Sequence, residues 1–304
     1  MLDKKSITAP KAAFATADKG KDLFAVGTDI AGMPTDSAGA LIYMARVLAQ
    51  VTIPHSNIKQ TQFVRQNGNQ RLVITDVQGI GLPYGVIPRL LLSWLTTEAT
   101  RRKTRRIELG HSLSQFLSEL GLNRAGGPRG DITRLREQMN RLFSCAIHLG
   151  DSTIENDHSR AMLIADDKDL WWNPSDQTGT LWQSHVTLSD RFFDAITDRP
   201  IPVDMRALSA LRRSPLALDL YCWATYRASY ASTASKIPWS SMQLQFGADY
   251  QDSAQGRQTF KRRFDDALRK VKVVYPALNL DLDEKGVTLF RSAPSVKLLP
   301  RRLK

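Results

Sequence analysis

The apolar residues of this chain recur at two spacings, and each spacing predicts one kind of element. Spacings of three and four residues, with Ser, Asp or Pro at several starts and Gly at several ends, predict helices. They are expected over 37–48, 88–101, 112–120, 131–144, 189–196, 214–230, 239–246 and 255–272. Alternating or short apolar runs predict strands. These are expected as hairpins over 63–77, over 145–149 with 160–165, and over 278–291, and as single strands over 107–109 and 182–188.

The order of these elements recurs along the chain. Helix, strand, helix, turn, helix and hairpin follow one another in the first half, and a similar order returns later without readable sequence identity. We therefore expect an α+β fold with two tandem winged helix-turn-helix domains, over 37–180 and 181–304. Residues 1–36 lack sustained periodicity and predict a flexible N-terminal arm.

The composition narrows the class of protein. With 42% hydrophobic and 24% charged residues the chain resembles a folded soluble protein, and no run approaches the roughly 18 apolar residues of a membrane span. The first residues contain no apolar run of signal-peptide length, because lysines and aspartates interrupt them, so a cytoplasmic location is expected. Cys145 and Cys222 lie among apolar neighbours, which favours buried free thiols over the alternative of a disulfide. The net charge of +12 predicts an anionic partner.

The segment 255–272 combines an apolar face with a cationic face. Its apolar residues, spaced by four, four and three positions, are Phe260, Phe264, Leu268 and Val271. Its bases are Arg257, Lys261, Arg262, Arg263, Arg269, Lys270 and Lys272. A two-faced helix after a short helix and a turn suits the major groove of double-stranded DNA, because its apolar back stays packed on the domain. The neutral Gln255, Gln258 and Thr259 can join Arg257 at base edges.

The alternative is a solvated helix whose charges pair along its own surface. Lys261 and Arg262 precede Asp265 and Asp266 by four residues, and these aspartates precede Arg269 and Lys270 by the same spacing. Two acids cannot neutralise seven bases, so the DNA-facing interpretation is favoured.

The helix over 131–144 occupies the equivalent place in the first half. The preceding GGPRG can offer backbone N–H groups to a phosphate, with Arg129 and Arg134 as the candidate contacts. As an N-cap, Asp131 would occupy those donors and repel an anion, so a purely structural cap is an equal alternative.

The hexamer RRKTRR is the densest basic run. Its cations are Arg101, Arg102, Lys103, Arg105 and Arg106. A solvated helix end is one interpretation, because cations are favourable there. The other is contact with the DNA backbone, which positions a protein without reading sequence.

The sequence contains no recognisable catalytic constellation. It lacks a G-x-x-x-x-G-K-[ST] loop, its five histidines are scattered, and neither zinc-ligand spacing nor the His-apolar-His triplet of rolling-circle nucleases occurs. We therefore expect no enzymatic activity, no cofactor and no metal; a nicking enzyme is the less favoured alternative.

The block from Pro83 to Phe143, with PYG, PRLLLSWLTTEATRRKTRRIELG, SLSQFLSELGL and GGPRGDITRLREQMNRLF, resembles the plasmid-encoded RepA family of replication initiators. The resemblance implies binding to repeated sites in a plasmid origin, opening of an AT-rich segment, and recruitment of the host initiator and replicative helicase. It also implies that the first domain serves dimerisation and backbone contact and that the second reads the major groove, with Arg257, Lys261, Arg262 and Arg263 matching its recognition helix. A winged-helix transcriptional repressor is the alternative, although the tandem pattern favours the initiator.

Overall fold

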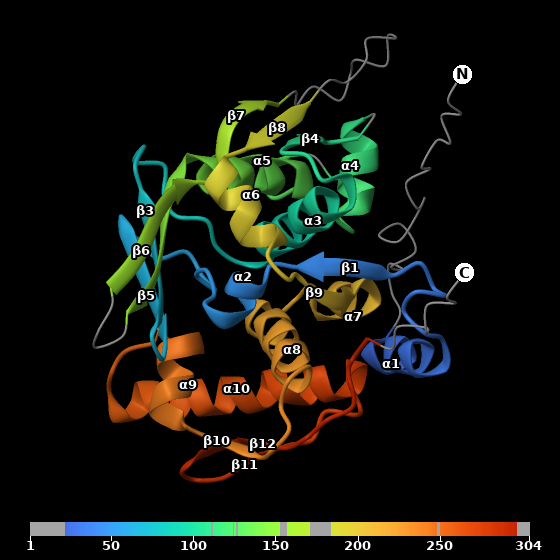
Figure 1. Ribbon diagram of the computed structural model, residues 1–304, viewed down its shortest axis with the longest axis vertical. Coiled ribbons are helices and arrows are strands. Elements are labelled where there is room, and N and C mark those ends of the chain that lie inside the picture. The colour runs from blue at the N-terminus through green and yellow to red at the C-terminus, as the bar shows by residue number, and fades with distance from the viewer. Residues whose placement is uncertain are drawn as a thin grey trace.

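The computed structural model describes residues 22–110, 112–123, 125, 127–152, 157–170, 184–247 and 250–296 (Figure 1). The helices are α1 (Leu23–Gly32), α2 (Arg46–Gln50), α3 (Val86–Arg102), α4 (Leu113–Glu119), α5 (Asp131–Ser144), α6 (Asp190–Thr197), α7 (Met205–Leu211), α8 (Pro215–Ala228), α9 (Trp239–Phe246) and α10 (Ala254–Val274). The strands are β1 (Leu41–Met44), β2 (Gln62–Asn67), β3 (Gln70–Asp76), β4 (Arg106–Glu108), β5 (Cys145–Ser152), β6 (Asp157–Leu163), β7 (Ala165–Asp169), β8 (His185–Leu188), β9 (Ile201–Asp204), β10 (Ser235–Pro238), β11 (Leu280–Leu282) and β12 (Gly286–Leu289). The predicted α+β class is confirmed.

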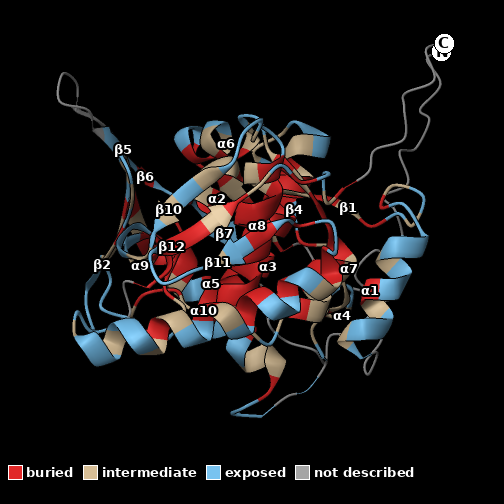
Figure 2. Cartoon of the chain, turned by 90° about the horizontal axis from the view of Figure 1, so that it is seen from below, coloured by how far each residue is buried: buried red, intermediate tan, exposed pale blue. Residues whose placement is uncertain are grey.

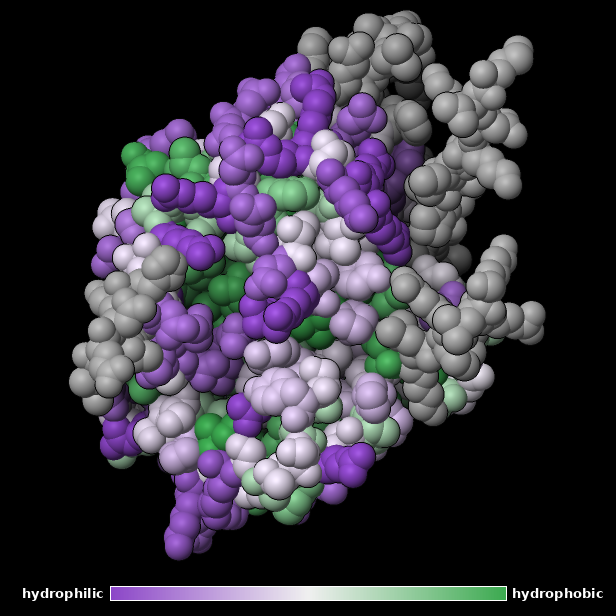
Figure 3. Space-filling model, in the orientation of Figure 1, coloured by the Kyte–Doolittle hydropathy of each residue, from purple (hydrophilic) through white to green (hydrophobic). Residues whose placement is uncertain are grey.

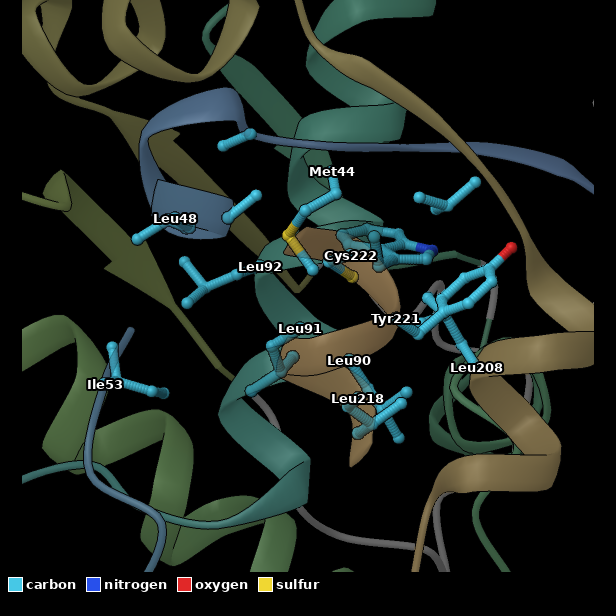
Figure 4. Close-up of a cluster of buried hydrophobic side chains, with 14 of the residues drawn as sticks. Met44, Leu48, Ile53, Leu90, Leu91, Leu92, Leu208, Leu218, Tyr221 and Cys222 are labelled. Carbon is cyan, nitrogen blue, oxygen red and sulfur yellow. The ribbon is translucent and has the colours of Figure 1, made fainter. Parts of the chain in front are cut away.

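Helices α3 and α8 lie at the centre of the molecule. Every residue of α3 from Ile87 to Thr97 is buried, and so is every residue of α8 from Leu216 to Thr225. A helix that is apolar nearly all round is a core helix, as the sequence predicts for 214–230. Figure 4 shows side chains of α3 and α8 meeting in one apolar cluster together with Met44. One hydrophobic core therefore joins the two halves of the chain.

Six elements of each half follow the same topology. The first unit is α3, β4, α4, α5, β7 and β8, and the second unit is α8, β10, α9, α10, β11 and β12. Their antiparallel sheets have the orders β4-β8-β7 and β10-β12-β11. In both units the strand before the helix pair, β4 or β10, pairs with the last strand, β8 or β12. The last strand also pairs with the strand that precedes it in sequence, β7 or β11. The predicted repeat of element order is therefore confirmed at the level of topology.

The hairpin predicted over 145–149 and 160–165 forms, but it lies in another sheet. Strands β5 and β6 extend the predicted hairpin β2–β3 into the order β2-β3-β5-β6. Ile147 stands opposite Ile74 in this sheet, and both are buried. Pairing of β5 with β3 gives its apolar side chains partners that are distant in sequence, which a local pattern cannot specify.

The place expected for that hairpin is taken by β7 and β8. Strand β8 pairs with both β4 and β7, so it belongs to the first unit, although the sequence pattern assigns the strand over 182–188 to the second domain. Ile107 of β4 and Val186 of β8 face each other with no exposed surface. The predicted boundary between residues 180 and 181 lies outside the described residues and stays a prediction.

The prediction of a flexible arm is wrong for residues 23–32, which form α1. This helix packs on α10 so closely that a Cβ at Gly27 would lie 2.5 Å from the carbonyl oxygen of Val273. Arg206 of α7 also donates to the carbonyl oxygens of Asp29 and Met33, at 3.1 and 2.9 Å. Tertiary contacts of this kind stabilise a short helix that its own sequence does not. Residues 1–21 of the predicted arm lie outside the described part of the chain.

The helix predicted over 37–48 is also wrong in part. Residues 41–44 are strand β1, which pairs antiparallel with β9, and the helical turn α2 begins only at Arg46. Ile42 and Met44 are the buried positions of an alternating pattern. A period of two, completed by the distant partner β9, therefore prevails here.

Cys145 and Cys222 are free and buried, so the predicted free thiols are confirmed. Burial raises the pKa of Cys145 to about 12, which keeps that thiol protonated and chemically inert at neutral pH. Among the helices that the structure describes, none has the length and apolar character to cross a membrane.

Candidate nucleic-acid interface

Aromatic side chains pack α9 against α10. Phe260 and Phe264 of α10 meet Trp239 of α9 edge to face, with ring centroids 6.3 and 5.4 Å apart. A Cβ at Gly247, just after α9, would lie 2.8 Å from the Phe260 ring, so this close approach requires a glycine. The Ser253 hydroxyl accepts a hydrogen bond from the N–H three residues on, at 3.0 Å, and caps α10. The predicted apolar face of α10 is buried as expected.

The opposite face of α10 carries cations that the helix itself does not neutralise. Of the four i,i+4 ion pairs that the alternative interpretation requires, only Arg269 with Asp265 forms, at 2.6 Å. Arg262, Arg263 and Lys270 are exposed and make no ion pair with another described residue. A helix whose charges are satisfied along its own surface therefore does not describe α10.

The N-terminal part of α10 holds the remaining candidates for base contact. Arg257 pairs with Asp252 at 2.7 Å, but both side chains are more than half exposed, so water screens this pair strongly. Gln258 is exposed beside it. Both side chains are free to turn toward a ligand at little energetic cost.

Lys261 faces the turn between β11 and β12. Its ammonium donates to the carbonyl oxygen of Glu284 at 3.3 Å and lies 5.2 Å from the centroid of the Trp239 ring. Trp239 in turn donates its indole N–H to the carbonyl oxygen of Asp283 at 2.8 Å. The Asp283 carboxylate accepts from Lys236 at 2.5 Å, and this bond, with backbone N–H donors of the turn, lowers the pKa of Asp283. Lys261 therefore holds this turn against α10.

In the first unit, α5 begins differently from the prediction. Gly130 is its N-cap residue, and Asp131 is the first helical residue. The Asp131 carboxylate accepts from the backbone N–H of Asn123 at 2.8 Å and pairs with Arg134 at 3.2 Å. Asp131 is thus not the N-cap, because Gly130, whose backbone is extended, holds that position and the helix starts at Asp131 rather than after it. Arg129 is exposed and makes no ion pair with a described residue.

The C-terminal half of α5 contains one cation that is held and one that is free. Arg141 pairs with Glu137 at 2.7 Å, donates to the carbonyl oxygen of Leu82 at 3.2 Å, and lies over the Tyr84 ring. Arg136 is exposed without an ion pair among the described residues. Arg136 was not among the predicted contacts. The absence of any acid three or four positions from it in the sequence is the signal that could have identified it.

The structure ties much of the RRKTRR hexamer to the protein itself. Arg101 donates to the carbonyl oxygen of Leu41 at 2.5 Å, and Arg102 pairs with Glu98 at 2.7 Å. Lys103 ends α3 in a left-handed conformation, with φ of 53°, and is exposed.

The second half of the hexamer lies beside β7 and α6. Arg105 is within 3.0 Å of Asp166 and 3.1 Å of Asp190, so two acids compensate its charge. Arg106 is exposed on β4 and makes no ion pair with a described residue. Lys103 and Arg106 are therefore the residues of this hexamer that remain most available to a phosphate.

A buried ionic network joins the two units. The Arg89 guanidinium of α3 binds both carboxylate oxygens of Asp219 of α8, at 2.8 and 2.7 Å, and donates to the carbonyl oxygens of Ile53, Pro54 and Gly85. His55 contacts the same carboxylate through Nε2, at 2.8 Å.

The protonation states in this network follow from burial and charge. Burial would raise the pKa of Asp219, but Arg89 and His55 outweigh that effect and hold the pKa at about 2. Burial also lowers the pKa of His55, and the charge of Arg89 adds to this effect, although Asp219 opposes it. The network therefore consists of a charged Arg89–Asp219 pair with a neutral histidine at pH 7.

The loop before β2 connects the two candidate helices. Asn57 of this loop accepts from Arg141 of α5 at 3.5 Å, and His55 lines a cleft beside α10. In Figure 1, α5 lies in the upper part of the molecule and α10 along its lower part, so the two helices lie at different depths in the view of Figure 2. The loop therefore links α5, through Asn57, to the cleft beside α10 that His55 lines. The face seen in Figure 3 carries its hydrophobic residues in small separate patches.

The fold and this surface define a mixed α+β protein made of two similar units, the second of which presents a cationic helix. Residues 82–239, just over half of the chain, match the family described as plasmid encoded RepA protein. The chain therefore belongs to the RepA family, the replication initiators that the block from Pro83 to Phe143 resembles. The matched range ends at the first residue of α9, so α10 lies beyond it.

Two solved structures of RctB are similar to this chain. The chain is similar to the crystal structure of selenomethionine derivatives of domains 2 and 3 of RctB, with a TM-score of 0.51 at 11% sequence identity, over 82% of this chain and 97% of that chain. A second structure of RctB domains 2 and 3 gives a TM-score of 0.46 at 12% identity, over 80% of this chain and 94% of that chain. Identity this low shows a shared fold alone. A comparison with curated proteins gives no match.

Proposed function

We propose that this RepA-family initiator binds repeated double-stranded DNA sites in a plasmid origin and reads them with α10. The observation that carries the proposal is the two-sided character of α10. Its apolar side is packed on the second unit, whereas Arg262, Arg263 and Lys270 are exposed without ion pairs among the described residues. An α-helix that projects cations from a rigid base suits the major groove, where Arg binds guanine through two hydrogen bonds.

We propose that each unit is a winged helix-turn-helix domain. The order of helices and strands and the strand order of both small sheets support this assignment. In the second unit the turn between β11 and β12 corresponds to a wing, and Lys261 holds it beside α10.

The first unit is proposed to contact the DNA backbone. Its candidate phosphate ligands are Arg129, Arg134 and Arg136 near α5, with Lys103 and Arg106 of the basic hexamer as weaker candidates. Phosphate contacts of this kind add affinity that depends on salt and is independent of sequence.

Three further parts of the proposal rest on the family. The protein opens an AT-rich segment of the origin, recruits the host initiator and replicative helicase, and forms a homodimer in one of its states. It acts in the cytoplasm without enzymatic activity, cofactor or metal. Among the described residues, no group of three or more His, Cys, Asp or Glu side chains could hold a metal ion.

The central test is the double variant Arg262→Ala with Arg263→Ala. The specific ligand is a direct repeat sought in the DNA that flanks the gene, and a scrambled duplex of equal length is the reference. Each lost arginine contact to a base is worth about 1–3 kcal/mol, so the preference for the repeat should fall at least about tenfold. The matched control, Arg71→Ala with Arg199→Ala, removes two exposed arginines outside the two units. An unchanged preference in a gel-shift titration would sink the proposal.

Two assays separate the alternatives. A mini-plasmid that carries the repeats and the gene should replicate with the wild-type protein and fail with the double variant. A repressor would leave replication intact and change only transcription. Supercoiled plasmid incubated with the protein and Mg²⁺ or Mn²⁺ should stay supercoiled, because a nicking enzyme would relax it.

A further inference from the structure

A cleft lies between α10, the start of α8 and the loop before β2. It has a volume of about 470 Å³ and is lined by four segments of the chain. His55 comes from the loop before β2, Ser214 to Leu216 form the start of α8, and Tyr250 precedes α10. The wall contributed by α10 consists of Arg263, Asp266, Ala267, Arg269 and Lys270.

The charge of this cleft favours an anion. Arg263 and Lys270 have no ion-pair partner among the described residues, whereas Arg269 is paired with Asp265. Asp266 is the acid of the lining, and it compensates one of the two free cations. A single net positive charge remains, which matches one phosphodiester.

The wall opposite α10 is rigid and adds no net charge. His55 is fixed by Asp219, whose charge is balanced by the buried Arg89. Arg89 also binds the carbonyl oxygens of residues 53 and 54, directly before His55. The anion-binding character of the cleft therefore comes from α10.

The helical geometry of α10 divides its cations into two rows. Arg263 and Lys270 are seven residues apart, which is two turns, so they lie on one line along the helix. Both line the cleft. Arg262 is displaced from that line by about 100° and lies opposite the buried face that Phe264 marks. Arg262 does not line the cleft; Arg269, two turns further along the same row, lines it but is paired with Asp265.

The cleft also lies on the path between the two candidate helices. The loop that contributes His55 reaches Arg141 of α5 through Asn57, at 3.5 Å. DNA that contacts both helices has this loop and the cleft between its two points of contact. If α10 enters the major groove, the cleft on its flank faces the DNA backbone and not the base edges.

We propose that the cleft binds a backbone phosphate of the DNA between the segments contacted by α5 and α10, with Arg263 and Lys270 as its ligands and Arg262 as the base-reading neighbour. This inference rests on the proposed function, because it requires DNA on α10. It assigns different tasks to Arg262 and Arg263, which the sequence presents as one basic pair.

Substitutions in the two rows test this division. Arg263→Ala with Lys270→Ala should weaken binding to the repeat and to a scrambled duplex by the same factor, and should reduce the slope of log K against log salt by about 2, at about 0.9 for each lost contact. Arg262→Ala should instead lower the ratio of the two affinities about tenfold. Lysine should replace Arg263 with nearly full function, since a phosphate accepts any cation, but Lys should fail at position 262, where two parallel hydrogen bonds are needed.

Neutral DNA analogues identify the ligand directly. Methylphosphonates are placed one at a time in the DNA between the two contacted segments. At one position the substitution should weaken DNA binding by the wild-type protein and leave binding by the Arg263→Ala, Lys270→Ala variant unchanged. Calorimetry with inorganic phosphate and with AMP covers the other source of the same chemistry. Micromolar binding of either, lost in the variant while DNA binding persists, would overturn the assignment to DNA.

The outcomes separate the two proposals. If the wild-type protein does not prefer the repeat at all, the proposed function fails. If it prefers the repeat but Arg263→Ala changes selectivity as Arg262→Ala does, or if Arg263→Lys does not restore the salt slope, the cleft assignment fails alone. Thermal unfolding of each variant shows that the compared proteins are folded.

Discussion

The two units share a topology but differ in how their equivalent helices treat positive charge. On α5, Arg134 pairs with Asp131 and Arg141 pairs with Glu137, so the helix neutralises two of its own cations. On α10, the exposed Arg262, Arg263 and Lys270 have no such partner among the described residues, Lys272 donates to a backbone carbonyl oxygen only, and one i,i+4 pair forms. A shared fold therefore does not give a shared surface. The function of each unit has to be argued from its side chains.

The units also differ in what surrounds the helix pair. The second unit closes with a short turn that Asp283 and Lys261 hold in place. In the first unit, β5 and β6 follow α5 in sequence but belong to the four-stranded sheet β2-β3-β5-β6 and not to the small sheet. The four-stranded sheet also reaches the second unit, because β2 packs against α9. The comparison predicts that sequence selectivity belongs to the second unit.

The largest effect is expected where the two units are joined. Asp219→Ala leaves the buried Arg89 without its counter-ion, which should lower the free energy of unfolding by about 3–5 kcal/mol in urea denaturation. The surface pair Arg46–Asp198, whose side chains are 35% and 55% exposed, supplies the control, and Arg46→Ala should cost at most about 1 kcal/mol.

The same urea denaturation also tests whether the buried ion pair couples the two units. Because Arg89 and Asp219 lie on α3 and α8, the wild-type units should unfold in a single transition, which the shared core also favours. The variant Arg89→Met with Asp219→Leu should recover part of the lost stability, since it removes both charges. Equal costs for Asp219→Ala and Arg46→Ala would show that the buried pair does not couple the units.

Much of the fold could be predicted from local sequence patterns. The buried stripe of α10, the Ser214-Pro215 start of α8 and the first hairpin, β2–β3, all lie where the pattern indicates them. Elements that depend on distant partners were missed. Helix α1 needs the close contact of Gly27 with Val273, and β1 needs β9 to complete its pairing. The place of β5 and β6 in the four-stranded sheet likewise depends on a distant partner, because β5 pairs with β3.

The candidate site was predictable to a smaller extent. The sequence shows that α10 is basic, but which ion pairs form depends on side-chain positions set by neighbouring elements. Lys261 illustrates this, because the turn that it holds lies more than 20 residues away. One signal was present and unused: Arg89 in PRLLLSWL and Asp219 in PLALDLYCW are lone charges in otherwise apolar helices. Buried charges need partners, so these two residues could have been paired from sequence.

A smaller effect concerns the pH dependence of the free energy of unfolding, which follows from His55 in the buried network. Burial lowers the pKa of His55 in the folded protein, with Arg89 and Arg65 adding to the effect and Asp219 opposing it. As pH falls below about 6.5, the unfolded chain takes up this proton first, so the free energy of unfolding should fall by up to about 1.4 kcal/mol per pH unit until the folded pKa is reached. Urea unfolding between pH 7.5 and 5 measures this slope.

The histidine variant makes the assignment specific. His55→Gln can still donate to Asp219 but cannot titrate, so its stability should depend less on pH than that of the wild type over this range. His148→Gln, at an exposed position of β5, should retain the wild-type profile. If His55→Gln and wild type show parallel profiles, the neutral histidine is not the source of the dependence.

The smallest effect tests the electrostatic difference between α5 and α10 directly. Asp131→Asn with Glu137→Gln removes the acids that pair with Arg134 and Arg141 while preserving side-chain shape. Affinity for cognate and scrambled DNA should rise together by a few-fold, and the salt slope should steepen by about one, since Arg141 stays held by Leu82. Asp169→Asn with Asp194→Asn changes the net charge equally at exposed positions of β7 and α6 and should have less effect. If both pairs of substitutions raise affinity alike, the internal ion pairs of α5 are not what distinguishes it from α10, and overall charge accounts for the difference. If affinity rises for the cognate repeat alone, α5 reads bases, and selectivity is not confined to the second unit.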